Sequence, residues 1–371
     1  MEGPARARAR DLGIAIGELP AGPLNAITDV PGVLVGHCTV SWGGPELPPG
    51  SGPARTGVTA IFPHGDDIWH QRVVAGAFVA NGVGEVIGIS AIREWGLIET
   101  PLLLTNSQSA GAVYDATVRW MVARDPRAGI EDAVMPVVGE CDDGFLNDLR
   151  GMHVREQHVH EALDSAAAGP VAEGCVGAGT GMTCFDFKAG IGTSSRAVTA
   201  HGRPFTVGVL ALTNFGVRHR LAVDGVPVGR EITGLLPKEN REGSCIVVLA
   251  TDAPLSSRQC ERLAKRCSLG LAVTGSYASD GSGEIMVAFS TAHRIPRVNP
   301  DPLALTSVAN DHMQGLFEAA VDATAESVVN ALCAAHTTVG RDGNLAHALP
   351  LEQLVEVMGR HGRPAWLPPA G

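Results

Sequence analysis

The sequence predicts an α+β protein in which β-sheets are covered by helices. Short apolar runs that end at glycine or polar turns occur both early and late in the chain, which is typical of strands. Longer segments with an apolar face at helical spacing lie between these runs and after them. Because the two kinds of element do not alternate regularly, we expect a sandwich of sheets and covering helices rather than a βαβ array.

The length of the chain would allow two or three domains, but its sequence predicts a single large one. The chain has 371 residues, of which 45% are apolar and 18% are charged, so it is long enough to bury a large core. Glycine is abundant, at 46 residues, and aromatic residues make up only 4%. This balance favours tight turns and close packing of small residues. No internal repeat or linker divides the sequence, so we expect one domain over residues 1–371.

The first half of the chain is expected to hold turn-rich strands followed by two helices. Gly and Pro turns separate short apolar runs over residues 12–40, and a Pro/Gly-rich loop follows at 41–56. The apolar run at 57–62 predicts a strand. Apolar residues on one side of 110–123 predict a helix, and we expect a second helix at 153–168.

The second half is expected to hold three strands and two helices. A helix is predicted at 256–267, with its first residue as the N-cap and Gly270 ending it, and the longest helix at 306–335. The polar segment 223–243 should be an exposed connection between two strands. The three strands are apolar runs bounded by polar turns, at residues 206–212, 246–250 and 285–289.

Charge and apolar content restrict the partners of the protein. Acidic residues outnumber basic ones by 39 to 28, which gives a formal net charge of −11. A chain of this charge is not expected to bind nucleic acid or an anionic membrane as its main partner. No apolar stretch with a cleavage site follows the N-terminal arginines, so we expect no secretory signal peptide. No run of about 18 apolar residues predicts a membrane span.

The patterns that resemble ligand sites lack the required spacing. The eight cysteines form no Cys-x-x-Cys pair, which favours free thiols in a reducing cytoplasm over disulfides or zinc. His153, His158 and His160 lack the His-Glu-x-x-His spacing of a zinc helix. The glycine-rich segments 81–85 and 177–181 lack the full dinucleotide or phosphate fingerprint. We therefore expect no metal or organic cofactor, a tight turn at 81–85 and close backbone packing at 177–181.

The clearest candidate for chemistry is the junction between Gly243 and Ser244, where a polar linker runs directly into an apolar strand. If this bond breaks, Ser244 carries a hydroxyl nucleophile and an α-amine that titrates near ~7.7–8.0 and can accept the hydroxyl proton. Glycine before the bond tolerates the strained backbone that attack by the hydroxyl requires. Gly-Ser pairs are also common in turns, so the pair alone does not establish a nucleophile.

Polar residues at two other strand ends can support such a nucleophile. Ser282 and Glu284 adjoin the predicted strand at 285–289, and residues two apart in an extended segment point the same way. If this strand neighbours the one after Ser244, a hydroxyl and a carboxylate face the nucleophile. Asn214 ends a third strand, where its amide can donate a hydrogen bond to an oxyanion. Each of these residues is also compatible with an ordinary turn.

A series of short segments, spread over nearly the whole chain, matches one family in a single order. The segments are residues 7–14, 27–33, 57–60, 105–107, 143–148, 177–182, 190–196, 250–255 and 340–343. In them the chain resembles the DmpA family of self-processing aminopeptidases, the L-aminopeptidase/D-esterase and β-peptidyl aminopeptidase group. The resemblance implies an αββα-like sandwich of the N-terminal-nucleophile type, as in ornithine acetyltransferases. It also implies cleavage into chains 1–243 and 244–371 that stay associated.

The same resemblance implies roles for individual residues. Ser244 corresponds to the nucleophile, and Ser282 and Glu284 correspond to the supporting acid and base residues. Asn214 corresponds to the oxyanion amide, and Glu140 to the carboxylate that receives the free amine of the substrate. A bond further along a peptide leaves Glu140 unpaired, which accounts for cleavage at the N-terminus. The implied activity releases N-terminal residues from short peptides, amides or esters through an acyl-enzyme, in a homo-oligomer of processed heterodimers.

One departure from the family leaves alternatives open. Members carry a Tyr near the segment after the residue that matches Glu140, whereas this chain has Cys-Asp-Asp-Gly-Phe, with an extra acid at Asp142. That carboxylate either changes the charge of the pocket or is solvated. Two other functions are an acyltransferase or amide-oligomer hydrolase of the same fold, which typically self-processes at Thr, and an uncleaved, non-catalytic relative. Ser244 favours the aminopeptidase over the first, and the retained polar residues argue against the second.

Overall fold

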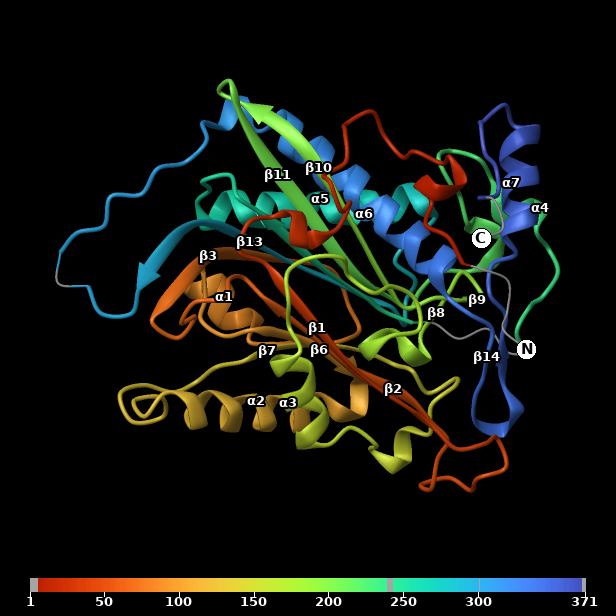
Figure 1. Cartoon of the computed structure of the whole chain (residues 1–371), viewed down its shortest axis with the longest axis horizontal. Helices are drawn as coiled ribbons and strands as arrows, with labels where there is room; N and C mark the ends of the chain where they lie inside the picture. Colours follow the sequence, from red (N-terminus) through yellow and green to blue (C-terminus); the bar gives the residue numbers. More distant parts are fainter. Residues whose placement is uncertain (1–5, 239–242, 300, 369–371) are drawn as a thin grey trace.

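The computed structural model describes residues 6–238, 243–299 and 301–368. These residues form four stacked layers, with two sheets in the middle and helices on both outer sides (Figure 1). The outer layers are α5 (Ser257–Thr274) with α6 (Gln314–Ala334) on one side and α2 (Ala110–Arg124) with α3 (Glu156–Asp164) on the other. The predicted α+β sandwich is therefore confirmed.

The sheet that packs against α5 and α6 has six strands in the order β10-β11-β12-β13-β3-β5. Its strands are β3 (Gln71–Gly82), β5 (Leu97–Ile98), β10 (Ile191–Ala200), β11 (Arg203–Thr213), β12 (Cys245–Thr251) and β13 (Gly283–Pro296). Strands β12 and β13 run parallel, whereas all the other pairs of this sheet are antiparallel. The residues that precede β12 and β13 consequently lie at the same edge of the sheet.

The sheet that packs against α2 and α3 has five strands in the order β1-β2-β6-β7-β4. Its strands are β1 (Leu34–Trp42), β2 (Ala54–Phe62), β4 (Val86–Ile87), β6 (Leu102–Asn106) and β7 (Val137–Cys141). The short elements that complete the fold are α1 (Ile89–Trp95), β8 (Thr183–Cys184), β9 (Phe187–Lys188), α4 (Val228–Glu231), β14 (Thr338–Val339), β15 (Leu345–Ala346) and α7 (Leu351–Arg360).

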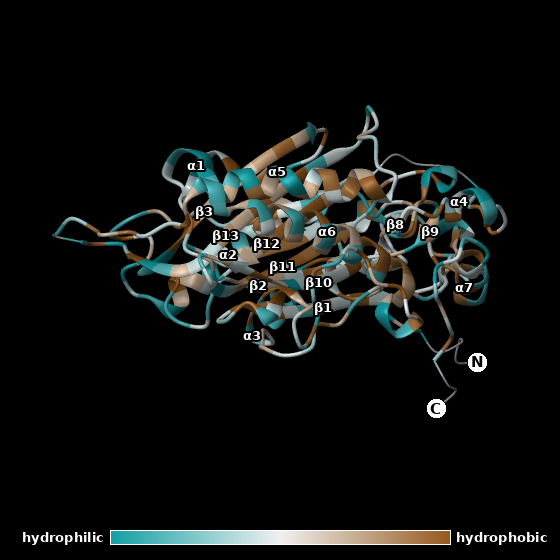
Figure 2. Cartoon of the chain, turned by 90° about the horizontal axis from the view of Figure 1, so that it is seen from above, coloured by the Kyte–Doolittle hydropathy of each residue, from teal (hydrophilic) through white to brown (hydrophobic). Residues whose placement is uncertain are grey.

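Apolar side chains fill the space between each pair of neighbouring layers. Separate clusters lie between the helix pair α5 and α6 and their sheet, between the two sheets, and between the second sheet and α2 and α3. Figure 2 shows the strands in the middle of the molecule as mainly hydrophobic. Every residue of β12 is buried, which explains its uninterrupted apolar sequence. Among the described helices, none combines the length and apolar content that a membrane span requires.

The helix boundaries differ from those predicted. Helix α5 begins after its predicted N-cap, Ser256, whose hydroxyl accepts a hydrogen bond from the Gln259 amide at 3.3 Å. It then continues past Gly270, because that glycine lies where α5 crosses α6: a Cβ there would come within 2.6 Å of Thr324 Cβ. Helix α6 starts only at Gln314, and a loop with a 3₁₀ turn precedes it.

Candidate active site

The structure brings the predicted site residues together where the two sheets end side by side. Asn214 directly follows β11, Ser244 directly precedes β12, and Ser282 and Glu284 lie at the start of β13. Glu140 comes from β7 of the other sheet. Five residues from four segments that are far apart in the sequence thus surround one point at the surface.

Ser244 is held from three directions. Its hydroxyl accepts a hydrogen bond from the Gly283 amide at 3.3 Å and donates one to the Val83 carbonyl at 3.4 Å. The Ser244 carbonyl accepts a hydrogen bond from the backbone amide of Asn214 at 3.0 Å. The side chain is only 7% exposed, yet it borders an open cleft. These contacts fix the hydroxyl at the floor of the cleft, as a nucleophile requires.

A hydroxyl and a carboxylate form a buried pair beside this floor. Ser282 Oγ donates to Glu284 Oε1 at 2.5 Å, and both residues are 2% exposed. Burial raises the pKa of the Glu284 carboxyl, while hydrogen bonds from Ser282 and Asn81 act in the opposite direction. Glu284 Oε2 has no hydrogen-bond partner among the described residues. The pair can therefore accept a further proton or ammonium group.

The side-chain amide of Asn214 lies on the side of Ser244 opposite the Ser282–Glu284 pair. Its Oδ1 accepts from the Thr183 amide at 3.0 Å, and its Nδ2 donates to the Asp142 carbonyl at 2.8 Å. These two bonds fix the orientation of the amide and use one of its two N–H groups. Gly243 packs directly against it, since a Cβ on Gly243 would lie 2.8 Å from Asn214 Nδ2. Gly243, the residue that precedes Ser244, is thus next to a side chain able to stabilise an oxyanion.

Glu140 presents a fixed carboxylate to the same cleft. Its Oε1 accepts from the Glu85 amide at 2.8 Å, and its Oε2 accepts from the Ser107 hydroxyl. The cleft has a volume of about 430 Å³ and is lined by residues from both sheets: Val83, Gly84, Glu85, Ser107, Ala110, Glu140, Asp142, Gly243, Ser244 and Gly281. Among the described residues, all the ionisable side chains in this lining are acidic, which favours a substrate with a positive charge.

The two acidic residues that follow Glu140 closely in the sequence, Asp142 and Asp143, differ in their surroundings. Asp142 is exposed and lines the cleft, and its Oδ1 also accepts from the Gly144 amide at 2.7 Å. It therefore adds charge to the cleft while remaining in contact with solvent. Asp143 is fully buried and accepts from Asn147 Nδ2 at 2.9 Å. Burial raises the pKa of this carboxyl to about 7.

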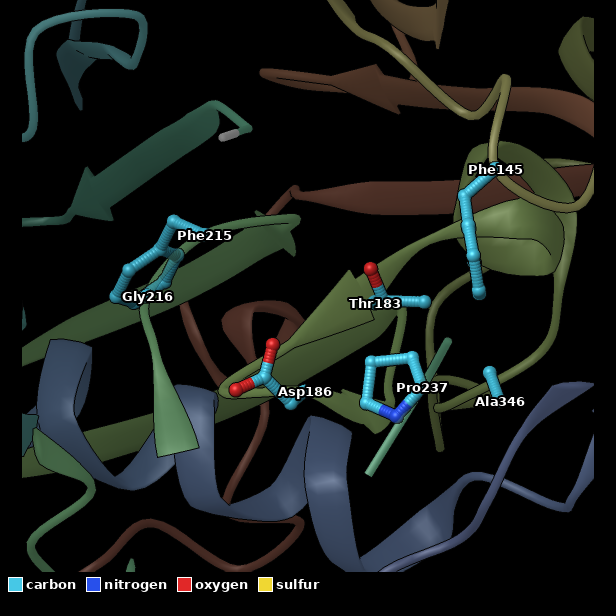
Figure 3. A pocket seen from close by; sticks show the side chains of 7 residues that line it. All are labelled: Phe145, Thr183, Asp186, Phe215, Gly216, Pro237 and Ala346. Carbon is cyan, nitrogen blue, oxygen red and sulfur yellow. The ribbon is translucent and has the colours of Figure 1, made fainter. Parts of the chain in front are cut away.

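A small cavity lies next to Thr183, whose backbone amide donates to the Asn214 side chain (Figure 3). It is lined by Phe145, Thr183, Asp186, Phe215, Gly216, Pro237 and Ala346. At about 20 Å³ it holds little more than one water molecule, so it is too small for a substrate group. Pro237 belongs to the polar linker, and buried Arg218 donates to the linker carbonyls of Ile232, Gly234 and Leu235 at 2.6–3.3 Å. The linker is thus anchored close to the site.

The structure gives the other polar patterns a structural role. Lys188 donates to three backbone carbonyls around the turn at 177–181, so this segment packs closely against its own chain, as predicted. Asp67, His70 and Asp125 are the one group of three possible metal ligands found within the described ranges, and they lie away from the cleft. Arg127 contacts both His70 and Asp125 there, so its positive charge offsets that of the Asp125 carboxylate.

Sequence reasoning did not identify several residues that shape the cleft. Ser107 follows the apolar run of β6, just as Asn214 follows β11, so the same strand-end signal was available for it. The predicted turn at 81–85 ends β3 at Gly82, and only its residues 83–85 then form one wall of the cleft, which the glycine-rich pattern does not reveal.

Comparisons with known proteins give one consistent assignment. The model of peptidase family S58 matches residues 25–346. The beta-peptidyl aminopeptidase BapA of Sphingosinicella microcystinivorans is 43% identical, over 98% of this chain and 93% of that protein. Two solved structures superpose closely, each over 96% of this chain and 99% of theirs. The Burkholderia sp. beta-aminopeptidase is 44% identical with a TM-score of 0.88. The Ochrobactrum anthropi l-aminopeptidase d-Ala-esterase/amidase, a variant of the Ntn hydrolase fold, is 43% identical with a TM-score of 0.91. The chain therefore has the predicted N-terminal-nucleophile fold and belongs to peptidase family S58.

Proposed function

We propose that the chain is a self-processing aminopeptidase in which Ser244 becomes the N-terminal nucleophile. The observation that carries this proposal is the parallel pairing of β12 with β13, in which Cys245 lies opposite Glu284. This register puts the residue before β12 beside the Ser282–Glu284 pair. Because Asn214 lies on the opposite side, a nucleophile at this point has a proton relay on one flank and an amide donor on the other.

The first stage is cleavage of the bond between Gly243 and Ser244. Ser244 Oγ attacks the Gly243 carbonyl carbon, the hydroxyl proton passes to the nitrogen of the breaking bond, and the acyl group moves to the oxygen as an ester. Water then hydrolyses the ester, which leaves a carboxylate on Gly243 and a free α-amine on Ser244. The packing of Gly243 against the Asn214 amide supports this stage.

The second stage is turnover of substrate by the exposed N-terminus. The Ser244 α-amine, with a pKa near ~8, takes the hydroxyl proton during attack and returns it to the leaving amine. The aminoacyl ester that forms is hydrolysed by water. The uncommitted N–H of Asn214 stabilises the oxyanion, and loss of one such donor costs roughly 10²–10³-fold in rate. Ser282 and Glu284 orient the α-amine and favour its charged form.

Glu140 gives the reaction its direction along the peptide. Its two hydrogen bonds hold the carboxylate in the cleft, where it can pair with the ammonium group of a substrate. An internal peptide bond offers no such group, so only N-terminal residues are released. The relatives are named for β-peptidyl and for L-aminopeptidase and D-Ala-esterase/amidase activities, and we propose aminoacyl amides, esters and short peptides as substrates here.

Intact mass spectrometry of the purified protein tests the self-processing step. We expect two fragments, one ending at Gly243 and one beginning at Ser244, and a single uncut chain for Ser244→Ala. Ser279→Ala, which removes a hydroxyl from the neighbouring loop, is the matched control and should be processed normally. A Ser244→Ala chain that still splits at this bond would refute the assignment of the nucleophile.

A matched pair of substrates tests the aminopeptidase activity separately. Alanine p-nitroanilide should be hydrolysed by the processed protein, whereas its N-acetyl form should not, because acetylation removes the charge that Glu140 pairs with. Equal hydrolysis of both compounds would contradict the role of Glu140. Processing without hydrolysis of any aminoacyl amide would leave a matured protein that is not an aminopeptidase.

A further inference from the structure

We propose that Gly84 determines which aminoacyl groups the cleft accepts, because its missing side chain leaves room for the extra methylene of a β-aminoacyl group. The inference rests on the proposed function, in which Glu140 binds the substrate amine and Ser244 attacks the carbonyl. It assigns a specificity role to a residue that takes no part in the chemistry itself.

The position of Gly84 relative to the two reacting points carries this inference. A Cβ on Gly84 would lie 3.5 Å from Ser244 Oγ and 3.6 Å from Glu140 Oε1. The space beside Gly84 is therefore in contact with both the nucleophile and the amine-binding carboxylate. A substrate that reaches from one to the other must pass along this space.

The two ends of this path are fixed, so the cleft does not adapt by moving them. Glu140 is held by the Glu85 amide and the Ser107 hydroxyl. Ser244 is held by the Gly283 amide and begins the central strand β12. A longer or shorter substrate must consequently adjust its own conformation within the same span.

Substrates differ in how much of this space they fill. In an α-aminoacyl group one carbon separates the amine from the carbonyl carbon, whereas in a β-aminoacyl group two carbons do. The second carbon adds one methylene to the path beside Gly84. A methyl group on residue 84 would take up about that volume, and one extra or missing methylene in a hydrophobic pocket changes specificity by roughly 10- to 200-fold.

Gly84→Ala is a clean test because the folded chain tolerates it. All the atoms nearest to the new methyl lie at 3.5 Å or more, which is ordinary van der Waals contact, and Gly84 is not among the glycines with positive φ. Gly82→Ala is the matched control. It lies two residues away, does not line the cleft, and its new methyl would meet only the Val79 side chain, at 3.6 Å.

The measurement is kcat/KM for β-alanine p-nitroanilide and for L-alanine p-nitroanilide with each variant. We expect Gly84→Ala to lower the β-alanine value at least about 10-fold more than the L-alanine value. Gly82→Ala should leave the ratio of the β-alanine to the L-alanine kcat/KM unchanged, and mass spectrometry should show normal processing of both variants. An unchanged ratio, or a loss confined to the α-substrate, overturns the proposal. If the wild type hydrolyses neither compound, the proposed function fails instead, and the two failures are thus distinguishable.

Discussion

Replacing Gly243 with alanine should separate maturation from turnover. A Cβ at this position would lie 1.9 Å from the Asn214 carbonyl oxygen and 2.8 Å from Asn214 Nδ2. The first contact is with backbone, which cannot rotate away as a flexible side chain can. Relief therefore requires a movement of at least about 1 Å in either the bond to be cleaved or the oxyanion donor.

A misplacement of about 1 Å typically lowers the rate of an enzymatic step about 10²-fold. We therefore expect Gly243→Ala to mature about 100-fold more slowly than the wild type, measured as the uncut fraction on denaturing gels over time. Once cut, residue 243 is the end of the first fragment and no longer takes part. The matured fraction should accordingly have wild-type kcat per N-terminal serine.

The matched control for this experiment is Gly234→Ala in the same linker, because a Cβ at residue 234 meets no atom of the described residues within 4 Å. This variant should mature at the wild-type rate. Maturation of Gly243→Ala as fast as the control would refute the reasoning, since it would mean that the contact with Asn214 does not govern cleavage. Equal slowing of both variants would show that the linker, rather than this contact, sets the rate.

Two further predictions concern the acids beside the site. Asp142→Asn keeps the oxygen that accepts from the Gly144 amide but removes an exposed negative charge. The kcat/KM for lysine p-nitroanilide should therefore fall about two- to five-fold relative to that for alanine p-nitroanilide, and this decrease should be smaller in high salt. Equal changes for both substrates would contradict a charge effect. The fold raises the pKa of Asp143 to about 7, so the native state keeps a proton that the unfolded chain loses near pH 4, and stability decreases as pH rises between these values. The test uses uncut Ser244→Ala protein and measures the free energy of unfolding in urea at several pH values. Asp143→Asn should reduce the decrease of this free energy with pH by about 1.4 kcal/mol per pH unit between pH 5 and 7. An unchanged pH dependence would exclude Asp143 as its source.

The site was more predictable from sequence than the elements around it. Ser244, Ser282 and Asn214 are polar residues directly beside apolar runs, and such runs place them at strand ends. These residues lie together only because β12 and β13 are neighbours in the sheet. The local sequence does not specify which strands pair, whereas the structure shows β12 and β13 paired in parallel. The family resemblance therefore predicted that the five candidate residues lie together, which local sequence alone could not, and their catalytic roles stay predictions.

Strand β10 illustrates what local patterns do not contain. Its sequence is rich in Ser and Thr and includes Arg196, so it has no apolar alternation, yet nearly all of it is buried. Arg196 is fully buried because it pairs with Glu326 of α6 at 2.7 Å, and Ser194 donates to the Ala323 carbonyl of the same helix at 2.6 Å. These partners are more than 120 residues away, so hydrophobic periodicity cannot detect the strand.

The strand order of the larger sheet has a consequence for the protein after cleavage. Strands β12 and β13 would belong to the second fragment, whereas β11 and β3 on their two sides would belong to the first. The fragments would be interleaved within one sheet, and neither could leave without breaking two ladders of backbone hydrogen bonds. Before the cut, refolding is a first-order process with the linker supplying an effective concentration on the order of millimolar; afterwards it becomes second-order. Maturation would thus convert a chain that can refold in a unimolecular reaction into a two-fragment protein whose lifetime depends on slow unfolding.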